Sequence, residues 1–357
     1  MTLTIKEILS SSTKPLILDG GLGSEIEDRG YDDDLNDPLW STIAIINHPD
    51  IIKEIQKDFM KNGADIIITC SYQTSAIGLL EHGKHLNIMT ENDCIDVFSK
   101  SNKISFEARE EFIKENPKLF ENNRRIKPLI AGSCGPYGAY KADRSEYTGD
   151  YKNVSIEILK DFHYLRLKIL LLSDEINFIA FETIPNFEEI KAIVQLFDKL
   201  VKDLKLKDKY YSLSLSFKNY NTLADGTKID EILNYLSSDK VTQSEKEHII
   251  AIGTNCSPLL FSHKTVEYLN KFNNKLHLPI IVYPNSGEVY NKSGRDHSKD
   301  PLLDDFVKEA KIEDKNDYNE ILRYLTKQWV ANGAKIIGGC CRITPANIKC
   351  IHDAAIL

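Results

Sequence analysis

Two adjacent cysteines near the end of the chain raise the first chemical question. They close the segment KIIGGCC (335–341), in which an apolar run is followed by two glycines and then by Cys340 and Cys341. The glycines allow another group to approach the backbone closely. A third cysteine, Cys256, ends a similar apolar run, IIAIGTNC (249–256). Three thiolates form the soft ligand set that zinc favours, and a catalytic zinc typically takes three protein ligands and leaves a fourth position open.

The same thiols also admit uses other than a catalytic zinc site. They could be coincidental buried side chains or a redox pair, because cysteine is often a small core residue. A metal-free enzyme with Cys340 or Cys341 as nucleophile would need a nearby base, usually a histidine, and none is evident near these motifs. A non-catalytic barrel with a structural zinc, serving in binding or regulation, would need a fourth ligand. Cys70 is the strand-end cysteine that could supply it.

Polar residues follow several other apolar runs and could bind a substrate beside the cysteines. Glu182 follows FIAF, and a carboxylate directly after a buried strand has few structural roles. Asp19 precedes two glycines and could instead be a turn residue. Tyr72 and Gln73 come shortly after the run DIIIT and could simply close the mouth of the fold. The candidate substrate-binding residues are Asp19, Gly20, Gly21, Tyr72, Gln73, Glu182 and Asn255.

Eight short apolar runs must position these residues. They predict strands at 16–21, 65–69, 128–133, 178–183, 211–217, 249–256, 279–286 and 335–341. Continuous apolar runs, rather than alternating ones, indicate burial on both faces, as in parallel sheets. The stretches between them predict amphipathic helices, most clearly at 48–63 and 186–201. Gly63 is a plausible stop for the first of these helices, and Asn186 a possible N-cap for the second.

Strands that alternate with helices predict an α/β fold, a parallel (β/α)8 TIM barrel in which residues 1–357 form a single domain. The strand count alone leaves a doubly wound open sheet as the alternative. The charged segments 84–125 and 292–320 are interpreted as long excursions over the barrel, and 299–317 as a solvated loop and helix. Active-site groups of such a barrel lie at the carboxyl ends of the strands. Strands six and eight flank strand seven, so Cys256 is expected to face the cysteine pair.

Composition excludes several classes of protein. The 357 residues are 42% hydrophobic and 27% charged, which is typical of a globular protein. A net charge of −8 provides no basic field for phosphates, so we expect no nucleic-acid partner. The amino terminus does not resemble a signal peptide and no apolar run is long enough to span a membrane, so we expect a cytoplasmic protein without membrane contact. Seven cysteines, an odd number, argue against a disulfide framework. The sequence predicts no oligomeric state.

Longer segments carry a family resemblance over nearly the whole chain. They are LDGGLGSEIEDRG (18–30), LNDPLWS (35–41), NGADIIITCSYQTS (62–75), GSCGPYGAYKADRSEYTGDY (132–151), FHYLR (162–166), FETIPN (181–186), GTNCSP (253–258), VYPNSGEVY (282–290) and GGCCRITP (338–345). With them the chain resembles the homocysteine S-methyltransferases, a family that includes betaine–homocysteine methyltransferase. The combination of GTNC and GGCC is highly specific. SYQ, GPYGAY, EYTGDY and YPNSGE resemble the subgroup that uses S-methylmethionine or S-adenosylmethionine.

The resemblance implies a zinc enzyme in which Cys256, Cys340 and Cys341 hold one metal ion and homocysteine sulfur takes the open position. It also implies that Asp19, the backbone of Gly20 and Gly21, and Glu182 hold the amino-acid end of homocysteine. The implied reaction transfers a methyl group from a sulfonium donor to the homocysteine thiolate and forms methionine.

The resemblance leaves the donor site less defined. A cationic donor favours aromatic or acidic partners, and the tyrosine candidates are Tyr72, Tyr137 and Tyr147. Where some relatives carry a tyrosine or asparagine that closes the zinc site in the absence of substrate, this chain has Gln73.

Overall fold

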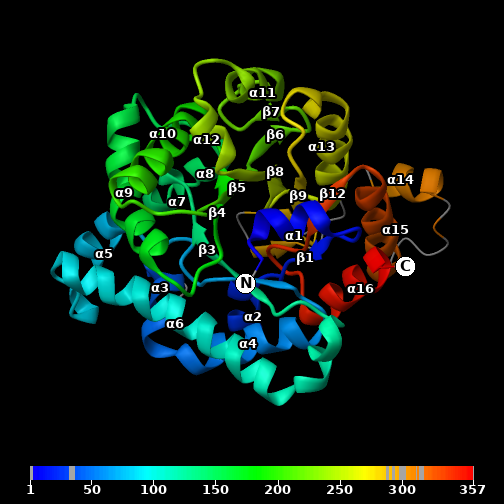
Figure 1. Cartoon of the computed structure of the whole chain (residues 1–357), viewed down its shortest axis with the longest axis horizontal. Helices are drawn as coiled ribbons and strands as arrows, with labels where there is room; N and C mark the ends of the chain where they lie inside the picture. The colour runs from blue at the N-terminus through cyan, green and yellow to red at the C-terminus, as the bar shows by residue number, and fades with distance from the viewer. Residues whose placement is uncertain are drawn as a thin grey trace.

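Eight parallel strands form a nearly closed barrel with helices around it (Figure 1). The computed structural model describes residues 3–31, 37–286, 289–291, 294–296, 303–310, 312 and 317–356. The barrel strands are β1 (Leu16–Ile17), β2 (Ile66–Ile68), β3 (Leu129–Cys134), β4 (Phe178–Ile184), β5 (Tyr211–Leu215), β8 (Ile249–Asn255), β9 (Ile280–Tyr283) and β12 (Ala334–Ile337). They lie in the order β1-β12-β9-β8-β5-β4-β3-β2. The predicted TIM barrel is confirmed, and each predicted strand overlaps an observed one.

The barrel closes between its first two strands. Leu18, directly after β1, forms a parallel bridge with Ile66 of β2. The Asp65 N–H also donates to the carbonyl oxygen of Ile17 (2.7 Å). The alternative of an open doubly wound sheet is therefore wrong, because the two edge strands of an open sheet would lie apart.

Helices of the described chain surround the barrel. Those of the outer ring are α4 (Pro49–Lys61), α6 (Glu91–Glu115), α9 (Ile156–Leu172), α10 (Phe187–Asp203), α11 (Ile229–Ser237), α12 (Gln243–Glu247), α13 (Leu259–Phe272), α15 (Tyr318–Ala331) and α16 (Pro345–Ile356). The shorter helices are α1 (Ile5–Ser11), α2 (Leu22–Asp28), α3 (Trp40–Asn47), α5 (Ala76–His82), α7 (Tyr137–Lys141), α8 (Ser145–Thr148) and α14 (Leu303–Ala310). Two antiparallel pairs complete the fold: β6 (Phe217–Asn219) with β7 (Thr222–Leu223), and β10 (Val289–Asn291) with β11 (Gly294–Asp296).

The two clearest helix predictions are confirmed. Helix α4 ends at Lys61, and Gly63 follows with a φ of +105°, a conformation that a side chain would strain. Helix α10 is capped by Asn186, whose side chain accepts hydrogen bonds from the N–H groups of Glu188 and Glu189. These caps satisfy backbone groups that a helix end leaves unpaired.

The two charged segments have different outcomes. Most of 84–125 is α6, which packs against α3, α4 and α9 in the helical ring between β2 and β3, so it belongs to the ring and not to an excursion over the barrel. In 292–320 the structure describes β11, α14 and the start of α15, and the helix predicted within 299–317 corresponds to α14. The other parts of 299–317 lie outside the described residues, apart from Ile312 and Asp317.

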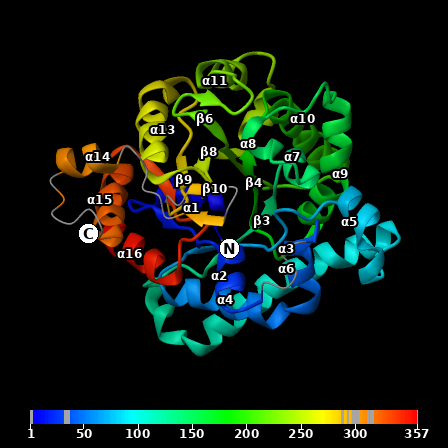
Figure 2. The same cartoon turned by 180° about the vertical axis from the view of Figure 1, so that it is seen from behind.

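The two ends of the barrel differ. At the amino end α1 lies across the strands, and its buried Ile5 and Leu9 pack into the cluster of side chains inside the barrel (Figure 1). The opposite end, where the strands terminate, carries α7, α8 and the β10–β11 pair (Figure 2). No helix in the described part of the chain is both long and apolar enough to cross a membrane. The carboxyl end is therefore the face on which the candidate residues gather.

Candidate active site

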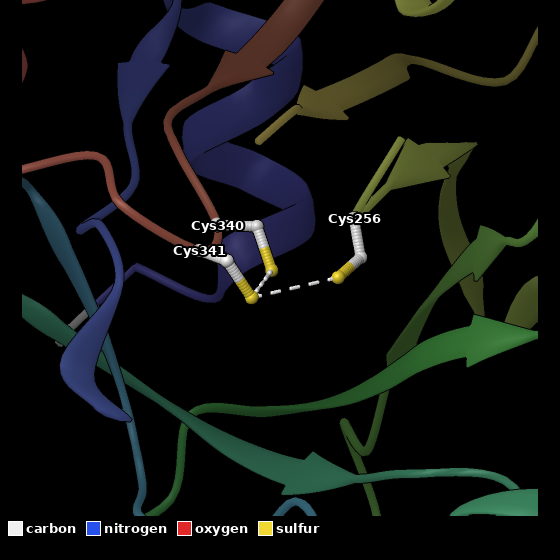
Figure 3. Close-up of side chains that lie close together, drawn as sticks. All are labelled: Cys256, Cys340 and Cys341. Carbon is white, nitrogen blue, oxygen red and sulfur yellow. Dashed lines mark hydrogen bonds between the residues drawn. The ribbon is translucent and has the colours of Figure 1, made fainter. Parts of the chain in front are cut away.

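The ends of β8 and β12 bring three cysteines to one place. Cys256 directly follows β8, and Cys340 and Cys341 lie just beyond β12 (Figure 3). Strand β9 separates the two groups, and its last residue and the residue that follows it hold both. The Cys256 N–H donates to the carbonyl oxygen of Tyr283 (3.2 Å), and the Cys340 N–H to that of Pro284 (2.8 Å).

The three sulfurs form a compact cluster. The Sγ atoms of Cys256 and Cys341 are 3.7 Å apart, and those of Cys340 and Cys341 are 4.0 Å apart. All three ligand atoms lie within 4.8 Å of one another, and all three side chains are half-buried. Two sulfurs that both bind zinc at about 2.3 Å lie roughly this far apart. The donor set and its spacing therefore fit zinc.

The electrostatics of the cluster call for a cation. The sulfurs of Cys256 and Cys341, together with burial, raise the pKa of the Cys340 thiol. The pKa of Cys341 is lowered, because hydrogen bonds from the Cys256 and Cys340 thiols stabilise its thiolate. Three adjacent thiolates repel one another unless a cation lies between them.

A tight turn sets the cysteine pair against the end of β1. The Gly339 N–H donates to the carbonyl oxygen of Asp19 (3.0 Å), and the Gly21 N–H to that of Ile343 (2.9 Å). A Cβ on Gly20 would lie 2.2 Å from the Ile343 oxygen, and one on Gly21 would lie 2.7 Å from the Cys340 oxygen. Both glycines of the DGG turn are required by this close approach to the backbone of Cys340 and Ile343.

One cavity of about 360 Å3 at the carboxyl end of the barrel joins these groups. It is lined by the three candidate zinc ligands and the seven candidate substrate-binding residues: Cys256, Cys340 and Cys341, with Asp19, Gly20, Gly21, Tyr72, Gln73, Glu182 and Asn255. Residues from β1, β2, β4, β8 and β12 are thus brought together over the three thiols.

Two buried carboxylates line the cavity. Asp19 is 2% exposed and Glu182 is 7% exposed. Asp19 Oδ2 accepts from the Ile68 N–H (2.8 Å), and Glu182 Oε1 accepts from the Ser133 hydroxyl (3.0 Å). Burial raises the pKa of Glu182 to about 8 and that of Asp19 well above its usual range. Two buried acids that lack a counter-charge can receive a cation such as an ammonium group.

Asn255 has a positioning role in the structure. Its Oδ1 accepts from the Thr183 N–H (2.7 Å) and its Nδ2 donates to Thr183 Oγ1 (2.8 Å). Thr183 has a φ of +58°, which is rare for a side chain branched at Cβ. The Asn255 amide holds this strained residue, and it thereby fixes the backbone directly after Glu182.

The tyrosine candidates separate into two groups. Tyr72 and Tyr147 line the cavity, and the Tyr147 hydroxyl lies 3.7 Å from Cys256 Sγ. The hydroxyl that the structure places beside a thiol is therefore on α8, and it belongs to Tyr147, one of the three tyrosines that the sequence offered. Tyr137 does not line the cavity; it packs against Phe162 and Tyr151, with ring centroids 5.2 and 5.3 Å apart.

Cys70 does not join the metal-ligand cluster. It lines the cavity and is buried, and burial raises its pKa to about 12. Among the described residues, the group of ligand atoms within 4.8 Å of one another contains only the other three cysteines. The closed four-ligand site with Cys70 therefore has no support in this geometry.

Sequence reasoning missed Glu146, which also lines the cavity. Burial is the main cause that raises its pKa, and the nearby Cys256 thiolate raises it further. It lies within the segment EYTGDY (146–151), which the sequence used only for resemblance. The sequence signal that could have identified Glu146 is its position directly before Tyr147, which was already a candidate for binding the donor.

A buried network of polar side chains packs against the segment that carries α7 and α8. Glu189 Oε1 accepts from the Tyr137 N–H (2.7 Å) and from His163 Nε2 (2.9 Å), and its Oε2 accepts from the Tyr151 hydroxyl (2.6 Å). Arg166 donates to His163 Nδ1 (2.6 Å). Burial lowers the pKa of His163 to about 4, so its ring is neutral at pH 7 and links the carboxylate to the guanidinium.

Comparison with known proteins supports the family resemblance that the sequence segments carry. A family model described as homocysteine S-methyltransferase matches residues 16–355. "Homocysteine S-methyltransferase 3" of Zea mays is 36% identical over 340 residues, covering 94% of this chain and 89% of its own. "Homocysteine S-methyltransferase YbgG" of Bacillus subtilis is also 36% identical, with coverages of 94% and 93%. The crystal structure of the metallated homocysteine methyltransferase MmuM from Escherichia coli has a TM-score of 0.73 at 31% identity, with coverages of 97% and 98%.

Proposed function

The chain belongs to the homocysteine S-methyltransferase family, and from this premise we propose that it is a zinc enzyme that methylates L-homocysteine from a sulfonium donor. The donor is S-methylmethionine or S-adenosylmethionine, and the products are methionine and the demethylated donor. The observation that carries the proposal is the cluster of three cysteine sulfurs in the cavity that Asp19 and Glu182 also line.

Cys256, Cys340 and Cys341 would hold the zinc. When bound, zinc lowers the pKa of a coordinated thiol, so that homocysteine is present as the thiolate nucleophile at neutral pH. The chain contributes the position of these ligands, because hydrogen bonds to the end of β9 and to the residue after it fix the backbone of both cysteine segments. The half-buried sulfurs face the cavity, where a substrate thiol can reach them.

Asp19 and Glu182 would receive the ammonium group of homocysteine. Both are buried and lack a nearby cation in the described chain, and a bound ammonium would lower their raised pKa values. The substrate carboxylate would be held by backbone N–H groups of the turn after β1. In that turn the Gly21 N–H already donates to Ile343, so the Gly20 N–H is the candidate donor.

The reaction is an in-line displacement at the methyl carbon. The homocysteine sulfur forms a bond to the methyl group while the bond from that group to the donor sulfur breaks. The electron pair of the broken bond stays on the donor sulfur, which becomes a neutral thioether. Tyr72 and Tyr147 would face the sulfonium by cation–π attraction. The position of Tyr137 outside the cavity removes it from this role.

A paired assay on the purified protein tests the proposal. We expect about one zinc per chain by elemental analysis after reducing purification. We also expect methionine to form from homocysteine with S-methylmethionine or with S-adenosylmethionine, assayed in parallel, with one of the two preferred. Absence of zinc would contradict the three-thiolate site, and zinc without turnover on either donor would contradict the proposed reaction.

Glu182→Gln is expected to weaken homocysteine binding selectively. The amide keeps the shape of the side chain but removes the charge that faces the ammonium group, so the KM for homocysteine should rise about 10- to 100-fold. The donor KM should change less than about threefold. The control is Ser133→Ala, which removes only the hydroxyl that orients Glu182 and should have a smaller effect. Equal losses for both substrates would remove Glu182 from this role.

A further inference from the structure

Glu146 lines the cavity and has one carboxylate oxygen without a hydrogen-bond partner among the described residues. It lies on α8, between β3 and β4, and lines the cavity beside Tyr147. Its Oε2 is buried and has no hydrogen-bond partner within the described part of the chain. A buried carboxylate oxygen that lacks a hydrogen bond is costly and therefore calls for an explanation. A ligand that brings a positive charge would provide one.

The position of this carboxylate is built into the fold. Gly138 of α7 packs directly against the backbone of Glu146, since a Cβ on Gly138 would lie 2.4 Å from the Glu146 nitrogen. The Asp143 side chain accepts from the Ser145 N–H (3.0 Å), and the Gly149 N–H donates to the Ser145 carbonyl (2.8 Å). Contacts on both sides of α8 thus hold Glu146 at the cavity.

The charges of the cavity leave Glu146 as its unassigned acid. The charged side chains among the described lining residues are all carboxylates: Asp19, Glu27, Glu146 and Glu182. Glu27 forms an ion pair with Arg342. Asp19 and Glu182 are assigned to the homocysteine ammonium under the proposed function. Glu146 therefore remains as a negative charge for a second cation.

We propose that Glu146 is the counter-charge that binds the cationic methyl donor. This inference rests on the proposed function, because the second cation in that reaction is the sulfonium. The hydroxyl of Tyr147, the next residue, lies 3.7 Å from Cys256 Sγ. Helix α8 therefore lies over the thiols that would hold the zinc and, through it, the homocysteine sulfur. Tyr72 lines the same cavity, and the charge of Glu146 acts on its hydroxyl. The carboxylate and two aromatic rings together form a site for a sulfonium.

The charge balance of the reaction predicts which kinetic constant depends on Glu146. The bond from the methyl group to the donor sulfur breaks, and its electron pair neutralises the sulfonium as the new bond to homocysteine sulfur forms. The positive charge that attracts Glu146 is therefore largest in the bound donor, smaller in the transition state and absent in the thioether product. An interaction of this kind lowers the donor KM and does not raise kcat. It also favours release of the neutral product.

The test is the variant Glu146→Gln, which keeps the shape and removes the charge. We expect the donor KM to rise about 10-fold or more, with kcat and the homocysteine KM changed less than about threefold. Asp150→Asn is the matched control, because Asp150 is exposed on the same segment and does not line the cavity. It should leave all three constants unchanged. Glu146→Asp, which keeps the charge on a shorter side chain, should fall between wild type and Glu146→Gln.

Calorimetric titration separates the charge from the rest of the donor. With zinc-loaded protein, Glu146→Gln should lose about 10-fold in affinity for S-methylmethionine but less than about twofold for methionine, its neutral thioether counterpart. If S-adenosylmethionine is the active donor, the pair is S-adenosylmethionine and S-adenosylhomocysteine. Equal losses for the charged and neutral ligands, or an unchanged donor KM in an active enzyme, would overturn the assignment. A wild-type protein that turns over neither donor would instead overturn the proposed function.

Discussion

Replacing Cys256 with alanine is expected to abolish zinc binding and turnover together while the barrel stays folded. Two thiolates cannot complete the three-ligand set of a catalytic zinc, so the zinc content should fall from about one per chain to below about 0.1 after dialysis. Turnover should fall at least about 100-fold, because the substrate thiol loses both its lowered pKa and its position. Cys340→Ala should behave in the same way.

The fold should survive because these cysteines lie at the cavity and not in the core. All three are half-buried, and their backbones are held by hydrogen bonds that alanine preserves. The free energy of unfolding should therefore change by less than about 1 kcal/mol, measured by urea denaturation of the metal-free proteins. Global unfolding of Cys256→Ala, or of the wild type after chelation, would show a structural role for the metal instead.

Cys70→Ala is the matched control for both measurements. Cys70 is also a cysteine that lines the cavity, but it lies outside the cluster of three sulfurs. The variant should keep one zinc per chain and most of the activity. Loss of zinc in Cys70→Ala would revive the closed four-ligand site and the non-catalytic interpretation.

The barrel could be predicted because its signals are local. Each strand is a short apolar run that stands out from charged helices, and parallel strands buried on both faces need no alternation. Once the barrel was assumed, its known polarity brought Cys256 and the Cys340–Cys341 pair to one end. The ten candidate residues that line the cavity could be predicted from one rule, that active-site groups of a barrel lie at or just beyond the carboxyl ends of its strands.

The missed features depend on geometry that a one-dimensional pattern does not contain. Helix α8 has only four residues, which is too short for any periodicity, so the position of Glu146 could not be predicted. Thr183 and Cys256 have positive φ values at the strand ends, and nothing in their residue types indicates this. The role of Asn255 likewise depends on the hydrogen bonds to Thr183, which join strands β4 and β8.

The network around Glu189 links the stability of the fold to the side of the cavity that we propose for the donor. Its carboxylate accepts from Tyr137, Tyr151 and His163, and the Tyr151 hydroxyl accepts from the Gly138 N–H (3.2 Å). Arg166 also donates to the Gly135 carbonyl. These bonds fix the segment that runs from β3 through α7 toward α8. A substitution that breaks the network should therefore displace Glu146 and Tyr147 as well as destabilise the core.

Glu189→Ala is accordingly expected to destabilise the protein by about 3–5 kcal/mol. The variant leaves the Arg166 guanidinium buried without its compensating charge, together with three donors that lose their acceptor. Urea denaturation measures the loss, with Tyr151→Phe as the control, because it removes one hydroxyl from the same network and should cost about 1–2 kcal/mol. Near-equal losses in the two variants would show that the buried charge pair contributes little. At a temperature where Glu189→Ala remains folded, the donor KM should rise more than the homocysteine KM, because α7 and α8 lie on the proposed donor side. A rise confined to homocysteine would instead connect the network to Asp19 and Glu182.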